Sequence, residues 1–293
     1  MWKKIVALSL LLVVVLSFTA CGEAGLPSAQ EIIDGVIESF DNIRTYQFDM
    51  DVTMDVAGES EGGAVGSTMT MANSGTLDLE NVQMRVDITV NSSTVAPEED
   101  DQEMRVELYI IDGMMYTMPE ALEEEPMWMK QEVPPEAWEN LKAIVGLETY
   151  KELIETVQVE VIGSEKVKGV DCYLLQLTPK MAQLWQIAMQ PIGGGVFEGG
   201  ILPSVPEEFL QEVFRSFSVR QWIAKDTYFL MKVKIDIVIE STPELMDYLE
   251  DEAEGEMMIE LTISLLAYNY NQPVSIVLPQ EAKEAIVVPS NGE

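Results

Sequence analysis

Near the start of the folded region, the apolar positions of this chain follow a helical period. Apolar residues recur every three or four positions over residues 32–40. Ser28 precedes them and Glu31 stands three residues later, which is the arrangement of a capping box at a helix start. The sequence therefore predicts an amphipathic helix that begins after Ser28 and ends near Asn42.

After this helix the period changes to two. Residues 46–56 alternate strictly between apolar and polar side chains, which predicts a long strand with one dry and one wet face. The same alternation returns further along the chain. The other predicted strands are 84–90, 104–110, 114–118, 127–133, 157–161, 170–177, 218–224, 227–240 and 257–265. Within 227–240, the residues expected to share one face are Met231, Val233, Ile235, Ile237 and Ile239.

Short turn sequences join several of these strands. Asp112-Gly113, between two apolar runs, is a strong hairpin signal. Residues 163–169 separate a second pair of strands, and Lys225-Asp226 separates a third. This succession of hairpins predicts a meandering antiparallel sheet, which can keep one face wet.

Three further segments favour helices, namely 135–156, 179–190 and 206–217, and a Gly-rich loop at 191–200 lies between the last two. Amphipathic helices need an apolar surface, and the dry face of the sheet supplies one. The simplest architecture is therefore of the α+β class, with helices gathered on one side of a long curved sheet. Because no change of composition divides the folded region, we expect one domain over residues 28–293.

The first twenty residues have the layout of a lipoprotein signal peptide. A positively charged start, an apolar run and small residues lead directly to Cys21. In signals of this kind the thiol is acylated and the chain is cut before it. We expect residues 1–20 to be removed, Cys21 to be lipidated, and 21–27 to tether the protein to the extracytoplasmic face of the cell membrane. An ordinary signal peptide, cut after Ala20, is the alternative.

The charge of the chain restricts its partners. Its 51 acidic and 17 basic residues give a net charge of −34. Such a chain is not attracted by electrostatics to nucleic acid phosphates or to anionic lipid head groups. A hydrophobic content of 47% is nevertheless too high for a disordered acidic chain.

Candidate catalytic chemistry is sparse. The chain has no histidine, which excludes Ser-His-Asp and Cys-His catalysis and the usual catalytic zinc sites. Its acidic runs lack the spacing of a Ca²⁺-binding loop, and residues 191–200 lack the Gly-Lys-Ser/Thr ending of a phosphate-binding loop. Cys172 is the one cysteine left in the folded part, and we expect it to be a buried apolar side chain. We expect no enzyme activity, no cofactor and no metal site; a hydrolase that uses carboxylates is the least favoured alternative.

Three local patterns carry a family resemblance. Residues 43–48, IRTYQF, lead from the predicted helix into the first strand. Residues 219–228, VRQWIAKDTY, are similar to a W-I-D-x-x-T hairpin, with Ala224 where Asp is common. Residues 268–279, YNYNQPVSIVLP, match a closing N-x-P-x-x-I-x-L-P run. Together they resemble the LolA/LolB-like lipoprotein superfamily, and more closely its LppX/LprG-like and related cell-envelope lipoproteins.

This resemblance implies a strongly curved antiparallel half-barrel with helices covering its concave, apolar side. In the better-understood relatives that space holds the acyl chains of lipoproteins or glycolipids, and in the periplasmic regulator RseB the fold serves sensing. Two functions therefore stay open. One is binding or transfer of a hydrophobic ligand, a lipid or acyl chains, in an apolar cavity between sheet and helices. The other is a non-enzymatic envelope interaction or sensor domain with a filled core.

The apolar faces of the predicted strands supply the candidate wall of such a cavity. Many of the 18 methionines fall on these faces, and thioether side chains adapt to irregular apolar shapes. A plain sheet–helix core that uses methionine is the alternative. We expect a monomer that binds a lipid, reaches the membrane through N-terminal acyl chains and binds no nucleic acid. The candidate ligand-binding residues are Tyr46, Phe48, Met50, Met54, Met84, Val86, Val106, Leu108, Ile235, Ile237, Leu261 and Ile263.

Overall fold

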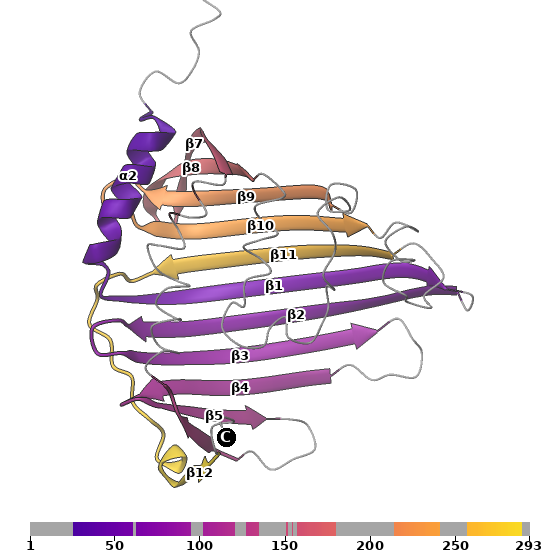
Figure 1. The fold of residues 1–293 in the computed structure, drawn as a ribbon, viewed down its shortest axis with the longest axis vertical. Coiled ribbons are helices and arrows are strands. Elements are labelled where there is room, and N and C mark those ends of the chain that lie inside the picture. The colour runs from indigo at the N-terminus through magenta and orange to yellow at the C-terminus, as the bar shows by residue number, and fades with distance from the viewer. Residues whose placement is uncertain are drawn as a thin grey trace, which may run out of the picture.

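The computed structural model describes residues 26–60, 63–94, 102–120, 127–134, 151, 154, 157–179, 214–240 and 257–288. These residues form one long, open sheet of twelve strands, with the helix α2 (Ala29–Ser39) across one end of the strands (Figure 1). Within these ranges, no helix is long and apolar enough to span a membrane. The predicted signal peptide, Cys21 and most of the residues in the three further predicted helices lie outside them.

The predicted N-terminal helix is confirmed, together with its cap. The backbone N–H of Glu31 donates to Oγ of Ser28 at 3.2 Å, and the backbone N–H of Ser28 donates to Oε2 of Glu31 at 2.7 Å. These two bonds satisfy donors that a helix start leaves without intrahelical partners. The short 3-10 helix η1 (Phe40–Asn42) then closes the segment before β1 begins.

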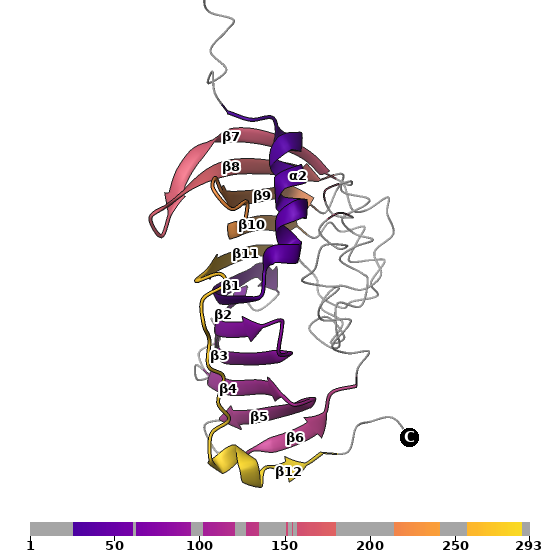
Figure 2. The same cartoon turned by 90° about the vertical axis from the view of Figure 1, so that its left-hand side faces the viewer.

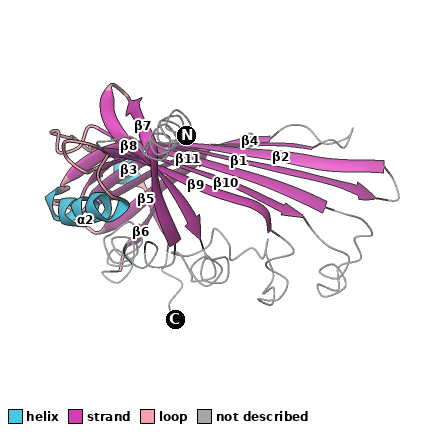
Figure 3. Cartoon of the chain, turned by 90° about the horizontal axis from the view of Figure 1, so that it is seen from above, coloured by secondary structure: helices cyan, strands magenta, loops and turns pink. Residues whose placement is uncertain are grey.

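The strands, in chain order, are β1 (Thr45–Ser60), β2 (Gly63–Asp78), β3 (Gln83–Thr94), β4 (Gln102–Ile111), β5 (Met114–Glu120), β6 (Met129–Glu132), β7 (Val157–Val167), β8 (Val170–Pro179), β9 (Phe214–Ala224), β10 (Leu230–Glu240), β11 (Met257–Tyr268) and β12 (Ile286–Val287). Their order across the sheet is β12-β6-β5-β4-β3-β2-β1-β11-β10-β9-β8-β7. Neighbouring strands run antiparallel, as predicted, except for the parallel pair of β12 and β6. Figure 3 shows the long strands β1 and β2 extending away from the end where α2 lies.

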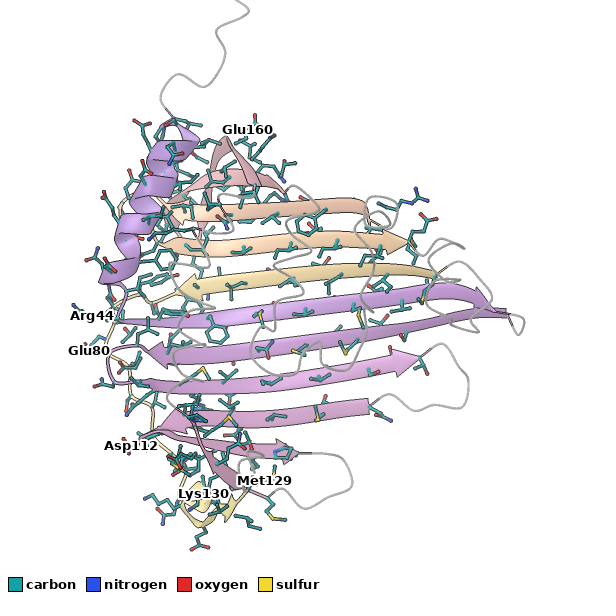
Figure 4. The ribbon with its side chains drawn as sticks, viewed as in Figure 1. Arg44, Glu80, Asp112, Met129, Lys130 and Glu160 are labelled. Atoms are coloured by element: carbon teal, nitrogen blue, oxygen red, sulfur yellow. The ribbon has the colours of Figure 1, made fainter. Side chains whose placement is uncertain are left out.

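The hairpin at Asp112-Gly113 has the turn that its sequence predicts, whereas the connection predicted over residues 163–169 is shorter, because β7 continues to Val167 and the turn takes only Lys168 and Gly169. Asp112 and Gly113, between β4 and β5, have φ values of 53° and 74°. Lys168 and Gly169, between β7 and β8, have φ values of 47° and 86°. Positive φ at both central residues matches the right-handed twist of the flanking strands. Figure 4 shows Asp112 at the same end of the sheet as Arg44 and Glu80.

Strand β2 is missing from the sequence prediction. It runs between β1 and β3 and pairs with both along most of its length. On the face of β2 that carries Met69 and Met71, the positions 67, 73 and 75 are Ser, Asn and Gly. The apolar alternation of this strand is therefore broken. The hydrogen bonds and apolar side chains of its two neighbours specify this strand more strongly than its own pattern does.

Two predictions at the other side of the sheet were wrong. The helix predicted over 206–217 conflicts with β9, which begins at Phe214; Phe217 lies opposite Ile237 of β10. Pairing with β10 has overridden the helical spacing there. Met231 does not share a face with Ile235, because a register shift next to it places its side chain in a cluster with Trp222 and Leu174.

One apolar cluster fixes α2 to the sheet. Ile32 and Val36 of the helix pack against Leu175, Val219 and Ile223 of β8 and β9. Figure 2 shows α2 beside the end of the sheet formed by β7 to β11. The helix can lie this close to Tyr228 because Gly35 has no side chain. A Cβ at this position would lie 2.5 Å from the ring of Tyr228, too close for two nonbonded carbon atoms.

The C-terminal segment extends the sheet at its opposite edge. After β11 the chain runs along the sheet to the 3-10 helix η2 (Glu281–Glu284) and β12 (Figure 2). There Ala282 and Ala285 pack with Tyr109 and Trp128, whose ring centroids lie 5.8 Å apart. This third apolar cluster packs the C-terminal segment against Tyr109 of β4 and against Trp128, which directly precedes β6.

Candidate functional site

The strand register divides the sheet into two faces of opposite character. Residues directly opposite each other in an antiparallel pair lie on the same face. On β1 the even-numbered residues from Tyr46 to Val56 lie on one face, which we call the apolar face together with the positions paired to them. Asp49, Asp51 and Asp55 lie on the other, which we call the polar face.

All twelve candidate ligand-binding residues lie on the apolar face. On one side of β1, Met54 lies opposite Leu261 of β11, which in turn lies opposite Ile237 of β10. Ile263 and Ile235 form the next pair along the same strands. These five candidate positions on β1, β10 and β11 thus belong to one surface.

The remaining candidates continue this surface on the other side of β1. Phe48 lies opposite Gly75 of β2, which lies opposite Val86 of β3, which lies opposite Leu108 of β4. The other candidates on this side are Tyr46, Met50, Met84 and Val106. From β4 to β10 the surface crosses six strands, so it is about 24 Å wide at the usual strand spacing.

The apolar face also contains residues that the sequence prediction omitted. Met69, Met71, Ile88, Val90, Val233 and Leu265 are paired with the candidate residues or lie between them. Ile88, Val90, Val233 and Leu265 stand in predicted strands and could have been found from their alternation. Met69 and Met71 lie on β2, and no local pattern identified that strand.

This face is predominantly apolar and carries no charge from β4 to β10 in the described strands. None of the described residues paired along it from β4 to β10 is charged. Val86 is buried and the other eleven candidates are half-buried. Such a surface can hold aliphatic groups but offers no pair of charges for acid–base chemistry.

The polar face has a different chemistry. Its carboxylates accept hydrogen bonds from neighbouring strands: Oδ1 of Asp55 from the Thr68 hydroxyl at 2.6 Å, and Oδ1 of Asp49 from the Tyr268 hydroxyl at 3.1 Å. Asp236 lies 2.9 Å from Nζ of Lys234. Among the described residues, no three His, Cys, Asp or Glu side chains are grouped so that they could hold a metal ion.

Tyr46 marks the end of the apolar face nearest α2. Its ring stacks on that of Tyr270 with centroids 5.7 Å apart, and the ring of Phe48 lies 6.4 Å away. Burial raises the pKa of the Tyr46 hydroxyl to about 12. Tyr46 therefore stays neutral at physiological pH and adds aromatic surface to this end of the wall.

Two of the motifs that carry the family resemblance meet at this end of the sheet. Oδ1 of Asn271 accepts the backbone N–H of Arg44, and its Nδ2 donates to the carbonyl of Asn42, both at 2.8 Å. The hydroxyl of Thr45 donates to the carbonyl of Gln272 at 2.8 Å. The closing run thus fastens the start of β1 and, with it, the start of the apolar wall.

The third motif forms the turn between β9 and β10. There Tyr228 has a φ of 58°, and its backbone carbonyl accepts a hydrogen bond from the Ser39 hydroxyl of α2 at 3.3 Å. The hydroxyl of Tyr270 donates to the carbonyl of Leu230 just beyond this turn. All three motifs therefore hold the end of the sheet together, and none of them lies in the middle of the apolar face.

The predicted structural role of Cys172 is confirmed. Its side chain is fully buried and unpaired with another cysteine, in the cluster that contains Trp222 and Leu174. Burial raises the pKa of the Cys172 thiol, so it stays neutral.

No protein-family model matches the chain, and a search of curated proteins found no match. Several solved structures are similar to it. LprF from Mycobacterium bovis is 14% identical, over 86% of this chain and 96% of LprF, with a TM-score of 0.40. Lipoprotein LppX from Mycobacterium tuberculosis is 11% identical, over 85% of this chain and 100% of LppX, with a TM-score of 0.37. A LolA superfamily protein from Nitrosomonas europaea is 11% identical, over 87% of this chain and 97% of that protein, with a TM-score of 0.21. The matches thus include the group that the local motifs resemble.

Proposed function

We propose that this protein is a non-enzymatic lipoprotein of the extracytoplasmic membrane face, and that it binds or transfers a hydrophobic ligand on the apolar face of its sheet. The ligand is a lipid or its acyl chains. The observation that carries this proposal is the single, uncharged surface formed by residues of β4, β3, β2, β1, β11 and β10.

The size and chemistry of this surface suit an extended acyl chain. From Tyr46 to Met54 the face runs for about 27 Å along β1, at the usual rise per residue. Each methylene removed from water contributes about 0.8 kcal/mol. Ten buried methylenes would contribute roughly 8 kcal/mol, part of which offsets the entropy lost on binding. Methionine side chains at Met50, Met54 and Met71 would let the wall adjust to chains of different shape.

The N-terminal sequence supports the location. Residues 1–20 followed by Cys21 have the order of a lipoprotein signal, and α2 begins at Ala29, only eight residues after that cysteine. A tether of this length keeps the domain close to the membrane. Two or more acyl chains on one residue give stable anchoring, whereas a single chain binds reversibly.

A pair of variants on one strand tests the binding surface. Leu261 lies on the apolar face of β11 and its neighbour Thr262 on the polar face, opposite Asp236. In the unlipidated Cys21→Ser protein, we expect Leu261→Glu to weaken binding of a fluorescently labelled monoacylglycerol at least tenfold. Thr262→Glu should change that affinity less than twofold.

Thermal unfolding of both variants is measured alongside, and Leu261→Ala is included because it removes contacts without adding a charge. Loss of binding in both Leu261 variants, at temperatures where both remain folded, supports the proposal. If the wild-type protein binds no labelled lipid, or if the two faces respond equally, the apolar face is not a ligand site. A fully packed interaction or sensor domain would then be the better description.

A further inference from the structure

Asn73 is a buried polar residue in the middle of the apolar face. It lies on β2, opposite Met50 of β1 and Ile88 of β3, with Met71 and Gly75 as its neighbours on the same face of its own strand. Only 6% of its surface is exposed. An amide among these apolar side chains costs free energy unless its polar atoms are hydrogen-bonded.

Two of the three other buried polar residues of the described chain, Ser39 and Asp78, have structural tasks at the end of a helix and in a turn. The Ser39 hydroxyl donates to the carbonyl of Val36 at the end of α2. Asp78 accepts both the backbone and the side-chain N–H of Asn81 in the turn between β2 and β3. Asn73 stands in mid-strand, where no turn or helix end requires an amide.

The hydrogen bonding of Asn73 is incomplete. Its Nδ2 donates to the backbone carbonyl of Met50 at 3.3 Å, and this contact fixes the orientation of the amide because a carbonyl can only accept. A side-chain amide has two N–H donors and a carbonyl acceptor. Among the described residues, nothing else donates to or accepts from the Asn73 side chain, so one N–H and Oδ1 stay free.

The register places the Asn73 side chain on the apolar face, between Met50 of β1 and Ile88 of β3. The Asn73 amide can therefore meet a ligand that lies along the apolar face.

The surroundings restrict the ligand chemistry. A free N–H binds a carbonyl oxygen, and Oδ1 binds a hydroxyl or an N–H. Because the described residues of this face carry no charge, a carboxylate or phosphate at this depth would be buried without a counter-ion. A neutral ester or amide linkage presents the carbonyl without that cost.

We propose that Asn73 is a specificity-determining residue, which hydrogen-bonds the ester or amide carbonyl of an acyl lipid lying on the apolar face. This inference rests on the proposed function and goes further, because it names the linkage of the ligand and its position on the wall. The carbonyl lies over β2, and the hydrocarbon chain lies along the neighbouring methionine and aliphatic side chains. An ester therefore binds more tightly than a hydrocarbon of equal length.

The test compares two probes with the same number of carbon atoms, one with an ester linkage and one without. Binding of methyl palmitate and of heptadecane is measured by competition against a labelled lipid, in the unlipidated full mature chain. The wild-type protein should prefer the ester. Asn73→Leu, whose side chain has the same branching at Cγ, should weaken ester binding about fivefold to tenfold, the usual size of one hydrogen bond. Its affinity for heptadecane should stay equal or rise.

Asn91→Leu is the matched control, because Asn91 lies on the polar face of the neighbouring strand β3, opposite Thr70 and Glu103. It should leave both affinities unchanged. A second measurement needs no variant: the side-chain amide resonance of Asn73 should shift when methyl palmitate is added and stay in place with heptadecane.

The outcomes separate the two proposals. If Asn73→Leu binds both probes as the wild type does, or if the amide resonance is unaffected by the ester, the role of Asn73 is wrong while the lipid site stands. If the wild-type protein binds neither probe, the proposed function fails, and the role of Asn73 fails with it.

Discussion

The ring of Phe48 on β1 fills the space in which any side chain of Gly75 on β2 would lie. A Cβ placed on Gly75 would be 2.4 Å from Cε1 of Phe48 and 3.0 Å from the backbone carbonyl oxygen of Arg85. The two residues are cross-strand partners on the apolar face. Glycine in the interior of a strand usually weakens that strand. Here the missing side chain of Gly75 leaves room for the ring of Phe48 to lie over β2.

This contact predicts a coupled effect on stability. Gly75→Ala should lower the free energy of unfolding by about 1–3 kcal/mol, the usual cost of overpacking, because Phe48 must move and the Arg85 carbonyl cannot. In a Phe48→Leu background the same change should cost clearly less. Urea unfolding of the four proteins measures the coupling, and equal losses in both backgrounds would show that Phe48 is not the obstacle.

The pKa of Tyr46 predicts a loss of stability in alkali. Burial favours the neutral hydroxyl in the folded protein, where its pKa is about 12 against 10.0 for an unperturbed tyrosine. The unfolded chain therefore loses this proton first, so the stability from Tyr46 is complete below pH 10 and is lost as the pH rises from 10 to 12.

Tyr46→Phe should remove this component, which is at most about 1.4 kcal/mol per pH unit. At pH 7 the variant and the wild type should have nearly equal free energies of unfolding. The measurement is denaturant unfolding at intervals from pH 7 to 12. Parallel curves for the two proteins above pH 10 would mean that the hydroxyl is not desolvated in the folded state.

We expect two separate contributions of Asn271 to stability, one from the hydrogen bonds of its side chain and one from its tolerance of a positive φ. Its φ of 57° is tolerated by asparagine and glycine, and its amide binds Arg44 and Asn42. Asn271→Gly should cost about 1–2 kcal/mol through the lost hydrogen bonds, and Asn271→Ala should cost more because the backbone is also strained. Thermal unfolding ranks the variants; the reverse order would contradict this explanation.

Membrane anchoring is predicted to depend on one of the two cysteines. Cys21→Ser should release the protein from membranes into the soluble fraction, because the acylated thiol is lost. Cys172→Ala should leave it bound, since Cys172 is a fully buried side chain of the fold. Fractionation of cells that express each variant is the measurement. A Cys21→Ser protein that still sediments with membranes would contradict the anchoring proposal.

The parts of the fold predicted from the sequence are those with strong local signals. The capping box at Ser28, the strict alternation of β1 and the Asp112-Gly113 turn each specify one local geometry, and the structure has all three. Because side chains alternate along a strand, correct strands also placed all twelve candidate residues on one face. Whether they bind a ligand stays a prediction.

The parts that the sequence did not predict depend on contacts between distant residues. Strand β2 is specified by its neighbours, and Gly75 lies on the apolar face only because Phe48 covers it. The position of Met231 follows from an irregular register between β9 and β10, which no pattern within β10 indicates. Asn73 interrupts the apolar alternation of β2, and its surroundings come from the strands on either side of it.

The most direct test of the central claim is native mass spectrometry of the mature, unlipidated protein purified from its own cell envelope without added lipid. We expect a bound species with the mass of an acyl lipid, which is released on denaturation and is absent from the folded Leu261→Glu protein. A wild-type protein that is folded, free of lipid and unable to take up an added monoacylglycerol would contradict it.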